Sequence, residues 1–189
     1  MKLSDSMVRA RLARVRALVF DVDGVLTQGE IIYTDTGEEV KVFDVKDGLG
    51  LRLAAAAGLE LALITGRAST IVQRRARDLR VTKVLQRVGD KAAAVQHLSR
   101  DRGIPLEEIA FMGDDLNDLE AMRACGASFA PADAVAEVRE AATVVTAAPG
   151  GRGAAREAVE AVLKAQGRWQ QVVEGYLRGL AEAYRSRRE

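Results

Sequence analysis

The sequence predicts an α/β protein with a doubly wound, Rossmann-like parallel sheet. Short apolar runs rich in Val, Ile, Leu and Phe alternate with longer segments of helical periodicity, and such alternation is typical of repeated strand–helix–strand units. Polar residues directly follow several of the apolar runs, as expected where buried parallel strands end. The 189 residues fit one domain, because domains commonly contain about 100 to 200 residues.

Six apolar runs are interpreted as buried strands. They lie at residues 17–20, 59–64, 81–85, 109–112, 128–130 and 143–145. Helical patterns lie between most of these runs, at residues 49–57, 69–79, 91–102, 116–124 and 133–141. Ser69, Asp90 and Asp133 stand where helix N-caps are expected. Each short strand is therefore followed by a helix or a turn, which returns the chain to the next parallel strand.

Residues 29–43 interrupt this alternation. Two short apolar arms surround the turn sequence Thr34-Asp35-Thr36-Gly37, and this pattern predicts a β-hairpin that projects after the first strand. Two interpretations stay open. The hairpin could fold back on its own domain as an ordinary edge, or its apolar arms could be buried against another subunit.

The C-terminal region is predicted to be helical. After the glycine-rich segment 149–153, a helical pattern reaches residue 167, and Trp169, Val172, Tyr176 and Leu180 then recur at helical spacing, which is typical of an amphipathic helix. Packing against its own domain or a neighbouring chain would satisfy this helix. We therefore predict one domain over residues 1–189, with the hairpin at 29–43 and a helical tail at 152–189.

Composition excludes several function classes. The net charge of +1, from 28 basic and 27 acidic side chains, gives no overall field that would attract nucleic acid or an anionic membrane. One cysteine rules out an internal disulfide, and no apolar window approaches the ~20 residues of a membrane span. We expect a cytoplasmic protein without nucleic-acid or membrane partners.

Reactive side chains cluster at the ends of the predicted elements. Asp21 and Asp23 follow the first strand, Thr65 and Asp114 follow two others, and Lys91 begins a helix. In open parallel sheets, ligands bind outside the carboxyl ends of the strands, where residues distant in sequence meet. A single acidic pair is a weak signal, but the ordered set predicts one site for a cation and a phosphate.

Each of these residues suits one step of phosphate-ester hydrolysis. Asp21 can attack phosphorus and form an aspartyl-phosphate, and Asp23 can protonate the leaving oxygen and later activate water. A protonated Asp23 is a hypothesis, which burial near another carboxylate would favour. Asp21, the Asp23 carbonyl and Asp114 suit Mg²⁺, which prefers oxygen ligands. Thr65 can bind phosphate, and Lys91 can stabilise the transition state.

The motifs DVDGV, ITGR, DK and GDDLND resemble the four signatures of the haloacid dehalogenase superfamily of phosphatases. Within it, TGEEVKVFDVKDGLG, QRVGDK and GGRGAAREAVEAVLKAQG are similar to segments of the 3-deoxy-D-manno-octulosonate 8-phosphate phosphatase family, and the resemblance covers residues 17–167. It implies a capless, Mg²⁺-dependent homotetramer that hydrolyses this phosphorylated sugar acid in lipopolysaccharide precursor synthesis. Spacing supports the missing cap: 44 residues from Asp21 to Thr65 and 26 from Thr65 to Lys91 leave no room for a lid domain.

The resemblance also implies a set of substrate-binding positions. They are Asp23, Asp44, Val45, Lys46, Asp47, Gly48, Arg52, Arg67, Arg75, Lys91 and Asn117. Arginine forks suit a substrate that carries both carboxylate and phosphate, although a solvated helix face would also explain Arg52 and Arg75. The chain departs from the family at Lys46, Leu49 and Arg87, where arginine, an aromatic residue and glycine are usual.

Two other functions stay open. The chain could act on a nine-carbon sugar acid, such as an acylneuraminate or KDN 9-phosphate, but glutamate is common in that branch where this chain has Arg67. Related modules can also serve chiefly as non-catalytic tetramerisation domains. The complete set of reactive side chains argues against that second alternative.

Overall fold

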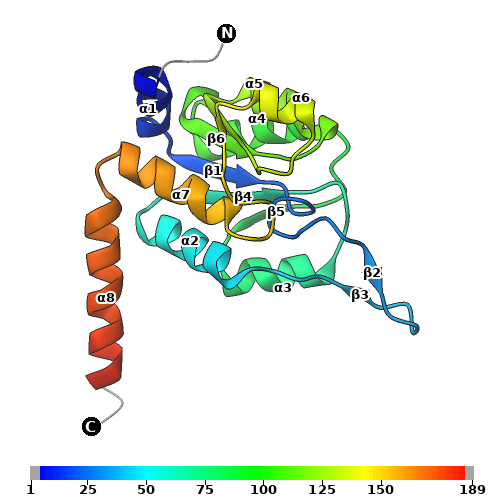
Figure 1. Cartoon of the computed structure of the whole chain (residues 1–189), viewed down its shortest axis with the longest axis horizontal. Helices are drawn as coiled ribbons and strands as arrows, with labels where there is room; N and C mark the ends of the chain where they lie inside the picture. The colour runs from blue at the N-terminus through cyan, green and yellow to red at the C-terminus, as the bar shows by residue number, and fades with distance from the viewer. Residues whose placement is uncertain (1–4, 186–189) are drawn as a thin grey trace.

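The protein, described by a computed structural model over residues 5–185, has a six-stranded sheet between two layers of helices (Figure 1). The strand order is β5-β4-β1-β6-β7-β8, and every neighbouring pair is parallel. The bounds are β1 (Ala17–Phe20), β4 (Glu60–Ile64), β5 (Lys83–Leu85), β6 (Ile109–Met112), β7 (Ala127–Ala130) and β8 (Val144–Val145). This confirms the predicted doubly wound fold and places β1 between β4 and β6.

Alternate side chains of β1 enter two separate cores. Leu18 and Phe20 pack in one core and Ala17 and Val19 in the other, because successive residues of a strand face opposite sides of the sheet. The first core includes residues of α1 (Asp5–Ala13), α2 (Val45–Ala56), α3 (Thr70–Asp78) and α7 (Ala154–Ala165). The second includes residues of α4 (Lys91–Arg102), α5 (Leu119–Ala124) and α6 (Ala136–Ala141). With helices on both faces, only the edges and strand ends are open to ligands.

Helix α2 begins at Val45, four residues before the predicted start. The Asp44 carboxylate caps it by accepting hydrogen bonds from the backbone N–H groups of Lys46 (2.5 Å) and Asp47 (3.4 Å). Gly48, a weak helix former, lies in this first turn and hides it in the sequence. The predicted Asp90 cap of α4 is confirmed, since its carboxylate accepts from Ala93 N–H at 2.9 Å.

Other boundaries differ from the sequence interpretation. Ser69 occupies the N-cap position of α3 but makes no side-chain capping bond. Asp133 is not the N-cap of α6, because its carboxylate accepts from the N–H of Gly150 at 2.8 Å and Val135 precedes the helix instead. The predicted helix at 116–124 is a 3₁₀ turn, Leu116–Asp118, followed by α5. Helix α1 and a short 3₁₀ turn at Leu106–Glu108 were not predicted.

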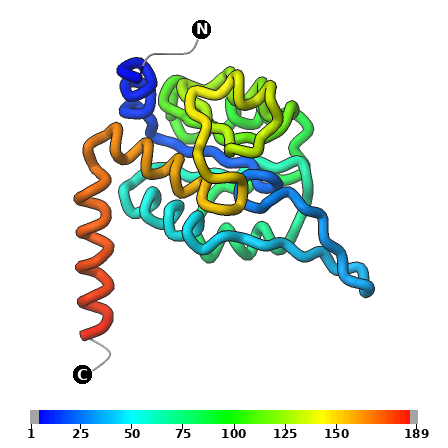
Figure 2. Tube along the Cα trace, in the orientation of Figure 1, coloured from blue at the N-terminus to red at the C-terminus, as the bar shows by residue number. Residues whose placement is uncertain are grey.

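Two segments extend from the body in different directions (Figure 2). Strands β2 (Ile32–Tyr33) and β3 (Glu39–Val40) form the antiparallel hairpin that the sequence predicts after β1. Helix α8 (Trp169–Arg185) follows α7 after a turn that contains Gly167. The predicted domain (1–189) and tail (152–189) include residues 1–4 and 186–189, which lie outside the described residues. Within residues 5–185, no helix has the length and apolar character needed to cross a membrane.

Candidate active site

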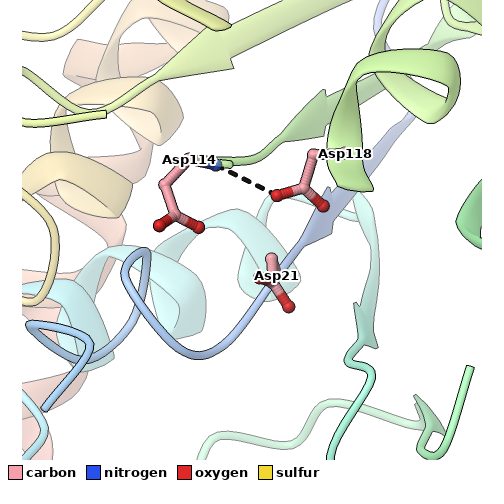
Figure 3. A group of neighbouring side chains, drawn as sticks. All are labelled: Asp21, Asp114 and Asp118. Carbon is pink, nitrogen blue, oxygen red and sulfur yellow. Dashed lines mark hydrogen bonds between the residues drawn. The ribbon is translucent and has the colours of Figure 1, made fainter. Parts of the chain in front are cut away.

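Three aspartates meet at the carboxyl end of the central strands (Figure 3). Asp21 directly follows β1, and its N–H donates to the carbonyl of Met112 at 2.9 Å, which extends the pairing with β6. Asp114 and Asp118 follow β6. One carboxylate oxygen from each aspartate lies within 4.8 Å of the others. The parallel pairing of β1 and β6 therefore brings Asp21 and Asp114, predicted from distant motifs, to one point.

Asp118 is a residue that the sequence interpretation missed. It is fully buried, and its Oδ2 accepts from the N–H groups of Asp114 (3.1 Å) and Asp115 (3.3 Å). Its Oδ1 accepts from Lys91 Nζ at 2.6 Å. The available signal was the last aspartate of GDDLND, four positions after Asp114. Because both oxygens are occupied, we assign Asp118 to positioning Asp114 and Lys91.

Lys91 is the buried cation of this site. Its side chain is 2% exposed, and Nζ lies 3.1 Å from Asp21 Oδ2 as well as bonding Asp118. Burial favours the neutral amine, but the two carboxylates outweigh it and raise the pKa of Lys91. The group therefore stays an ammonium ion at neutral pH, directly beside the predicted nucleophile.

The Asp21 and Asp114 carboxylates lack enough protein partners. Burial, followed by the charge of Asp118, raises the pKa of Asp21 to about 7, although Lys91 opposes the shift. Burial and the charges of Asp21 and Asp118 raise the pKa of Asp114 to about 7. The buried Oδ1 atoms of Asp21 and Asp114 have no hydrogen-bond partner within residues 5–185. Unpartnered carboxylate oxygens with mutually repelling charges fit Mg²⁺, a hard cation that takes oxygen ligands.

Gly24 lets the loop after β1 approach Asp114. Its φ of +92° lies in the left-handed region, and a Cβ atom there would lie 2.0 Å from Asp114 Oδ2. Any L-residue at this position would therefore clash with a predicted metal ligand. The glycine of the DVDGV motif has a direct role in the geometry of the site.

Asp23 contacts the hairpin instead of a second carboxylate. Its Oδ1 accepts a hydrogen bond from Lys41, whose side chain is 3% exposed and also lies 3.3 Å from Glu39. The neighbour that we expected for Asp23, another carboxylate, is thus replaced by a cation. Lys41 was missed, although charged and apolar residues alternate in the second arm of the hairpin, which offered a signal. In the structure Glu39 and Lys41 are partly covered, whereas Val40 and Val42 are exposed.

Thr65 lies where the phosphate site was predicted, directly after β4. The residue is 2% exposed, and its Oγ1 accepts from the N–H of Arg67 at 3.2 Å. Its hydroxyl proton is not used in that bond and can be donated to a phosphate oxygen. On the same loop side, Arg87 N–H donates to Arg67 O at 3.3 Å. The φ of Arg87 is +57°, which explains physically why glycine suits this position.

The predicted substrate segment 44–48 forms the first turn of α2. Val45 is 80% exposed and Lys46 is also exposed. Asp47 is buried, and its two oxygens accept from the N–H groups of Gly153 (3.0 Å) and Arg156 (2.8 Å). Asp47 therefore anchors α7 and has little capacity left for a ligand.

Arg75 is brought to the same turn. It donates to the Asp44 carbonyl at 3.3 Å and lies over the Phe43 ring, 5.6 Å from its centroid. A Cβ atom on Gly48 would lie 2.3 Å from the Arg75 guanidinium, so glycine makes this approach possible. The tertiary structure thus joins Arg75 to Asp44 and Gly48.

The other predicted substrate residues are placed differently. Arg67 donates to the Tyr33 hydroxyl at 3.2 Å and lies 3.5 Å from Glu39, so it contacts the hairpin. Asn117 is exposed on the 3₁₀ turn beside Asp118. Arg52 is not brought to this group, because it lines a separate pocket beside α8.

The carboxyl edge of this parallel sheet carries a candidate aspartate nucleophile, a second aspartate and a buried lysine. This arrangement defines a metal-dependent phosphotransfer enzyme of the haloacid dehalogenase type. The family of haloacid dehalogenase-like hydrolases matches residues 79–156. Curated relatives named 3-deoxy-D-manno-octulosonate 8-phosphate phosphatase occur in Haemophilus influenzae, 39% identical over 85% of this chain and 89% of the relative, and in Escherichia coli K12, 41% identical over 85% and 86%. The chain belongs to this phosphatase family.

Solved structures agree with this assignment. The Moraxella catarrhalis phosphatase of the same name, in complex with magnesium, phosphate and KDO, aligns with a TM-score of 0.89, 36% identity and coverage of 92% of this chain and 99% of that one. The cobalt-bound Haemophilus influenzae phosphatase aligns with a TM-score of 0.81 and 40% identity, over 84% and 93% of the two chains.

Proposed function

We propose that this protein is a Mg²⁺-dependent phosphatase that hydrolyses 3-deoxy-D-manno-octulosonate 8-phosphate to the free sugar acid and phosphate, in lipopolysaccharide precursor synthesis. The observation that carries the proposal is the pair of unpartnered oxygens on Asp21 and Asp114 beside the Lys91 ammonium. Family membership supports the substrate, since relatives at about 40% identity carry this name. The structural neighbour with KDO and phosphate bound supports it as well.

Asp21 is the nucleophile in the proposed reaction. One of its oxygens attacks phosphorus, and the bond from phosphorus to the sugar oxygen breaks as an aspartyl-phosphate forms. Lys91, 3.1 Å from Asp21 Oδ2, offsets the negative charge that would otherwise repel the incoming phosphate. Thr65 donates its hydroxyl proton to a phosphoryl oxygen. These groups are preorganised by burial, so little reorganisation is needed when charge develops.

Asp23 transfers the protons in this proposal. Asp23 enters the reaction protonated and gives that proton to the departing sugar oxygen as its bond to phosphorus breaks. The resulting carboxylate then removes a proton from the water that attacks the aspartyl-phosphate, which releases phosphate and restores Asp21. Its bond to Lys41 holds the carboxyl group in a fixed direction. Lys41 and the hairpin therefore belong to the positioning of the acid–base group.

Mg²⁺ would be held by the carboxylates of Asp21 and Asp114 and the carbonyl of Asp23. When bound, it would offset the charge of the two carboxylates and polarise a phosphoryl oxygen. Asp118 would keep Asp114 in place through the hydrogen bonds that it accepts from the backbone N–H groups of Asp114 and Asp115. Proposed contacts to the sugar acid come from the exposed members of the α2 turn, Val45 and Lys46, together with Arg67 and Arg75.

A homotetramer is the proposed assembly, and the hairpin is its proposed contact. Ile31 (58%), Tyr33 (60%) and Val42 (57%) are exposed, whereas two charged side chains of the hairpin, Glu39 and Lys41, are partly covered and contact Arg67 and Asp23. An apolar outer surface of this kind is typical of a protein interface. Light scattering should give four times the chain mass, and Val42→Glu should lower it. A fully active monomer at micromolar concentration would rule the assembly out.

We also propose a cytoplasmic location.

The decisive experiment is a phosphate-release screen of the purified protein with Mg²⁺. Octulosonate 8-phosphate should be hydrolysed faster than neuraminate 9-phosphate or hexose phosphates. Asp21→Asn should abolish release, whereas Asp78→Asn, the same change at an exposed aspartate of α3, should not. Faster release from the nine-carbon substrate would favour that alternative. No release from any phosphomonoester would favour a tetramerisation module.

A further inference from the structure

A pocket lies away from the aspartate cluster. It has a volume of about 540 Å³ and is bounded by the second half of α2, the turn after α3 and the first half of α8. This volume is within the range of small-molecule sites. The predicted substrate segment forms the first turn of helix α2, and residues at the end of the helix line the pocket. After this end the chain turns into β4 (Figure 1). The pocket and the candidate active site therefore lie at opposite ends of α2.

The lining of this pocket is strongly basic. Arginines converge from three segments, and no aspartate or glutamate is among the lining residues. The four arginines are Arg52, Arg80, Arg168 and Arg178. Arginine stays charged at all accessible pH values, so this arrangement gathers positive charge in a concave surface although the whole chain has a net charge of only +1.

Three of these guanidinium groups are available for a ligand. The side chains of Arg52, Arg80 and Arg178 have no hydrogen-bond or ion-pair partner within the described part of the chain, residues 5–185. Arg168 is fixed in the wall, because it donates to the Ala57 carbonyl and, at 3.1 Å, to Gln166 Oε1. An anion would relieve the mutual repulsion that these cations now experience.

Arg80 adds a backbone observation. Its φ is +60°, in the left-handed region where glycine is favoured over any residue with a side chain. It follows the C-cap of α3, a position where glycine is common. The chain has an arginine there instead and bears the strain, which is typical of positions held for a function.

We propose that this pocket binds a diphosphate group, either as inorganic pyrophosphate or as part of a nucleotide. Guanidinium groups bind phosphate oxygens in bidentate pairs, and several arginines are needed only for an anion of more than one charge. Apart from Gln171, the remaining wall is mostly apolar and includes Leu53, Val172 and Tyr176. The tyrosine ring offers a surface on which a base can stack, so a nucleotide would use the whole pocket.

Calorimetric titration of the full-length protein tests the proposal. Pyrophosphate and a nucleoside diphosphate are titrated at pH 8 with EDTA, where the ionised carboxylates of Asp21 and Asp114 repel anions from the active site. We expect one saturable site per chain that weakens as salt is added. Arg80→Gln and Arg178→Gln should each weaken binding at least tenfold and leave hydrolysis at the wild-type rate. Arg74→Gln, an equal charge change on the exposed face of α3, should alter neither.

Arg80→Gly guards against a folding artefact, because glycine adopts a positive φ without strain and still removes the guanidinium. If the nucleotide binds more tightly than pyrophosphate, and this difference is lost in Tyr176→Ala, the site is assigned to nucleotides. If the two ligands bind equally well, the site is assigned to pyrophosphate. The proposal is overturned if neither anion binds at millimolar concentration. It is also overturned if binding is unchanged in both Arg80 variants, or if Thr65→Ala in the active site abolishes it.

Discussion

The crowding of carboxylates at the candidate metal site predicts how the stability of the metal-free protein depends on pH. Asp21 and Asp114 have pKa values raised from 3.8 to about 7. Between these values the folded protein holds protons that the unfolded chain has released. Unfolding therefore releases protons, and the free energy of unfolding falls as the pH rises from about 4 to about 7.

The magnitude follows from the size of the shift. A pKa change from 3.8 to about 7 corresponds to about 4 kcal/mol for one fully buried carboxyl group, because each tenfold change in proton affinity is worth about 1.4 kcal/mol. Partial exposure of Asp114 reduces its share to about 2 kcal/mol. Asp47, whose pKa is raised by burial, changes stability in the same direction but is distant from the metal ligands.

The assay is urea unfolding of the wild type and of Asp114→Asn at pH 5.5 and pH 8, with EDTA or with Mg²⁺. Metal-free wild type should be less stable at pH 8, and Asp114→Asn should lose about 2 kcal/mol of that difference. Magnesium at 100 times its Kd should restore about 2.7 kcal/mol to the wild type at pH 8, less at pH 5.5, and little to the variant. Asp78→Asn should behave as the wild type.

Three outcomes would refute this reasoning. Metal-free wild type could be equally stable at both pH values, the variant could keep the full pH dependence, or magnesium could stabilise the variant as much as the wild type. Each outcome would mean that burial and charge repulsion at the Asp114 carboxylate do not destabilise the metal-free protein as we propose.

Three further predictions concern single residues. Asp118→Ala should lower the free energy of unfolding by about 3 kcal/mol in urea titrations, because it removes a partner of the buried Lys91; a loss below 1 kcal/mol would contradict the proposed network. Lys41→Met should reduce kcat about tenfold or more, because Asp23 is no longer held by the lysine. Lys41→Arg should recover part of the rate. If the two variants have equal rates, the cation on the hairpin has no part in catalysis. Arg87→Gly should raise the free energy of unfolding by about 1 kcal/mol, since it relieves a left-handed backbone; no gain would show that the arginine side chain offsets this strain.

Local patterns in the sequence predicted the parallel sheet and most of its strands. The strand over residues 17–20 matches β1 residue for residue, because a buried strand that ends in two aspartates has an unambiguous pattern. The start of α2 was wrong because Asp44 caps a turn that contains glycine. The N-cap role of Asp133 was wrong because its carboxylate binds Gly150 instead, a partner distant in the sequence.

The candidate site, too, could be predicted from the sequence only in part. Asp21, Thr65, Lys91 and Asp114 could be singled out because each ends a strand or begins a helix, and parallel strands end at one edge. Only the tertiary structure decided that Asp118 bonds Lys91 at 2.6 Å and that Lys41 reaches Asp23 from the hairpin. Sequence periodicity reports which face of its own element a residue occupies, whereas these contacts depend on how separate elements pack. The same limit hid the basic pocket, whose arginines come from three segments and meet only when α8 lies against α2.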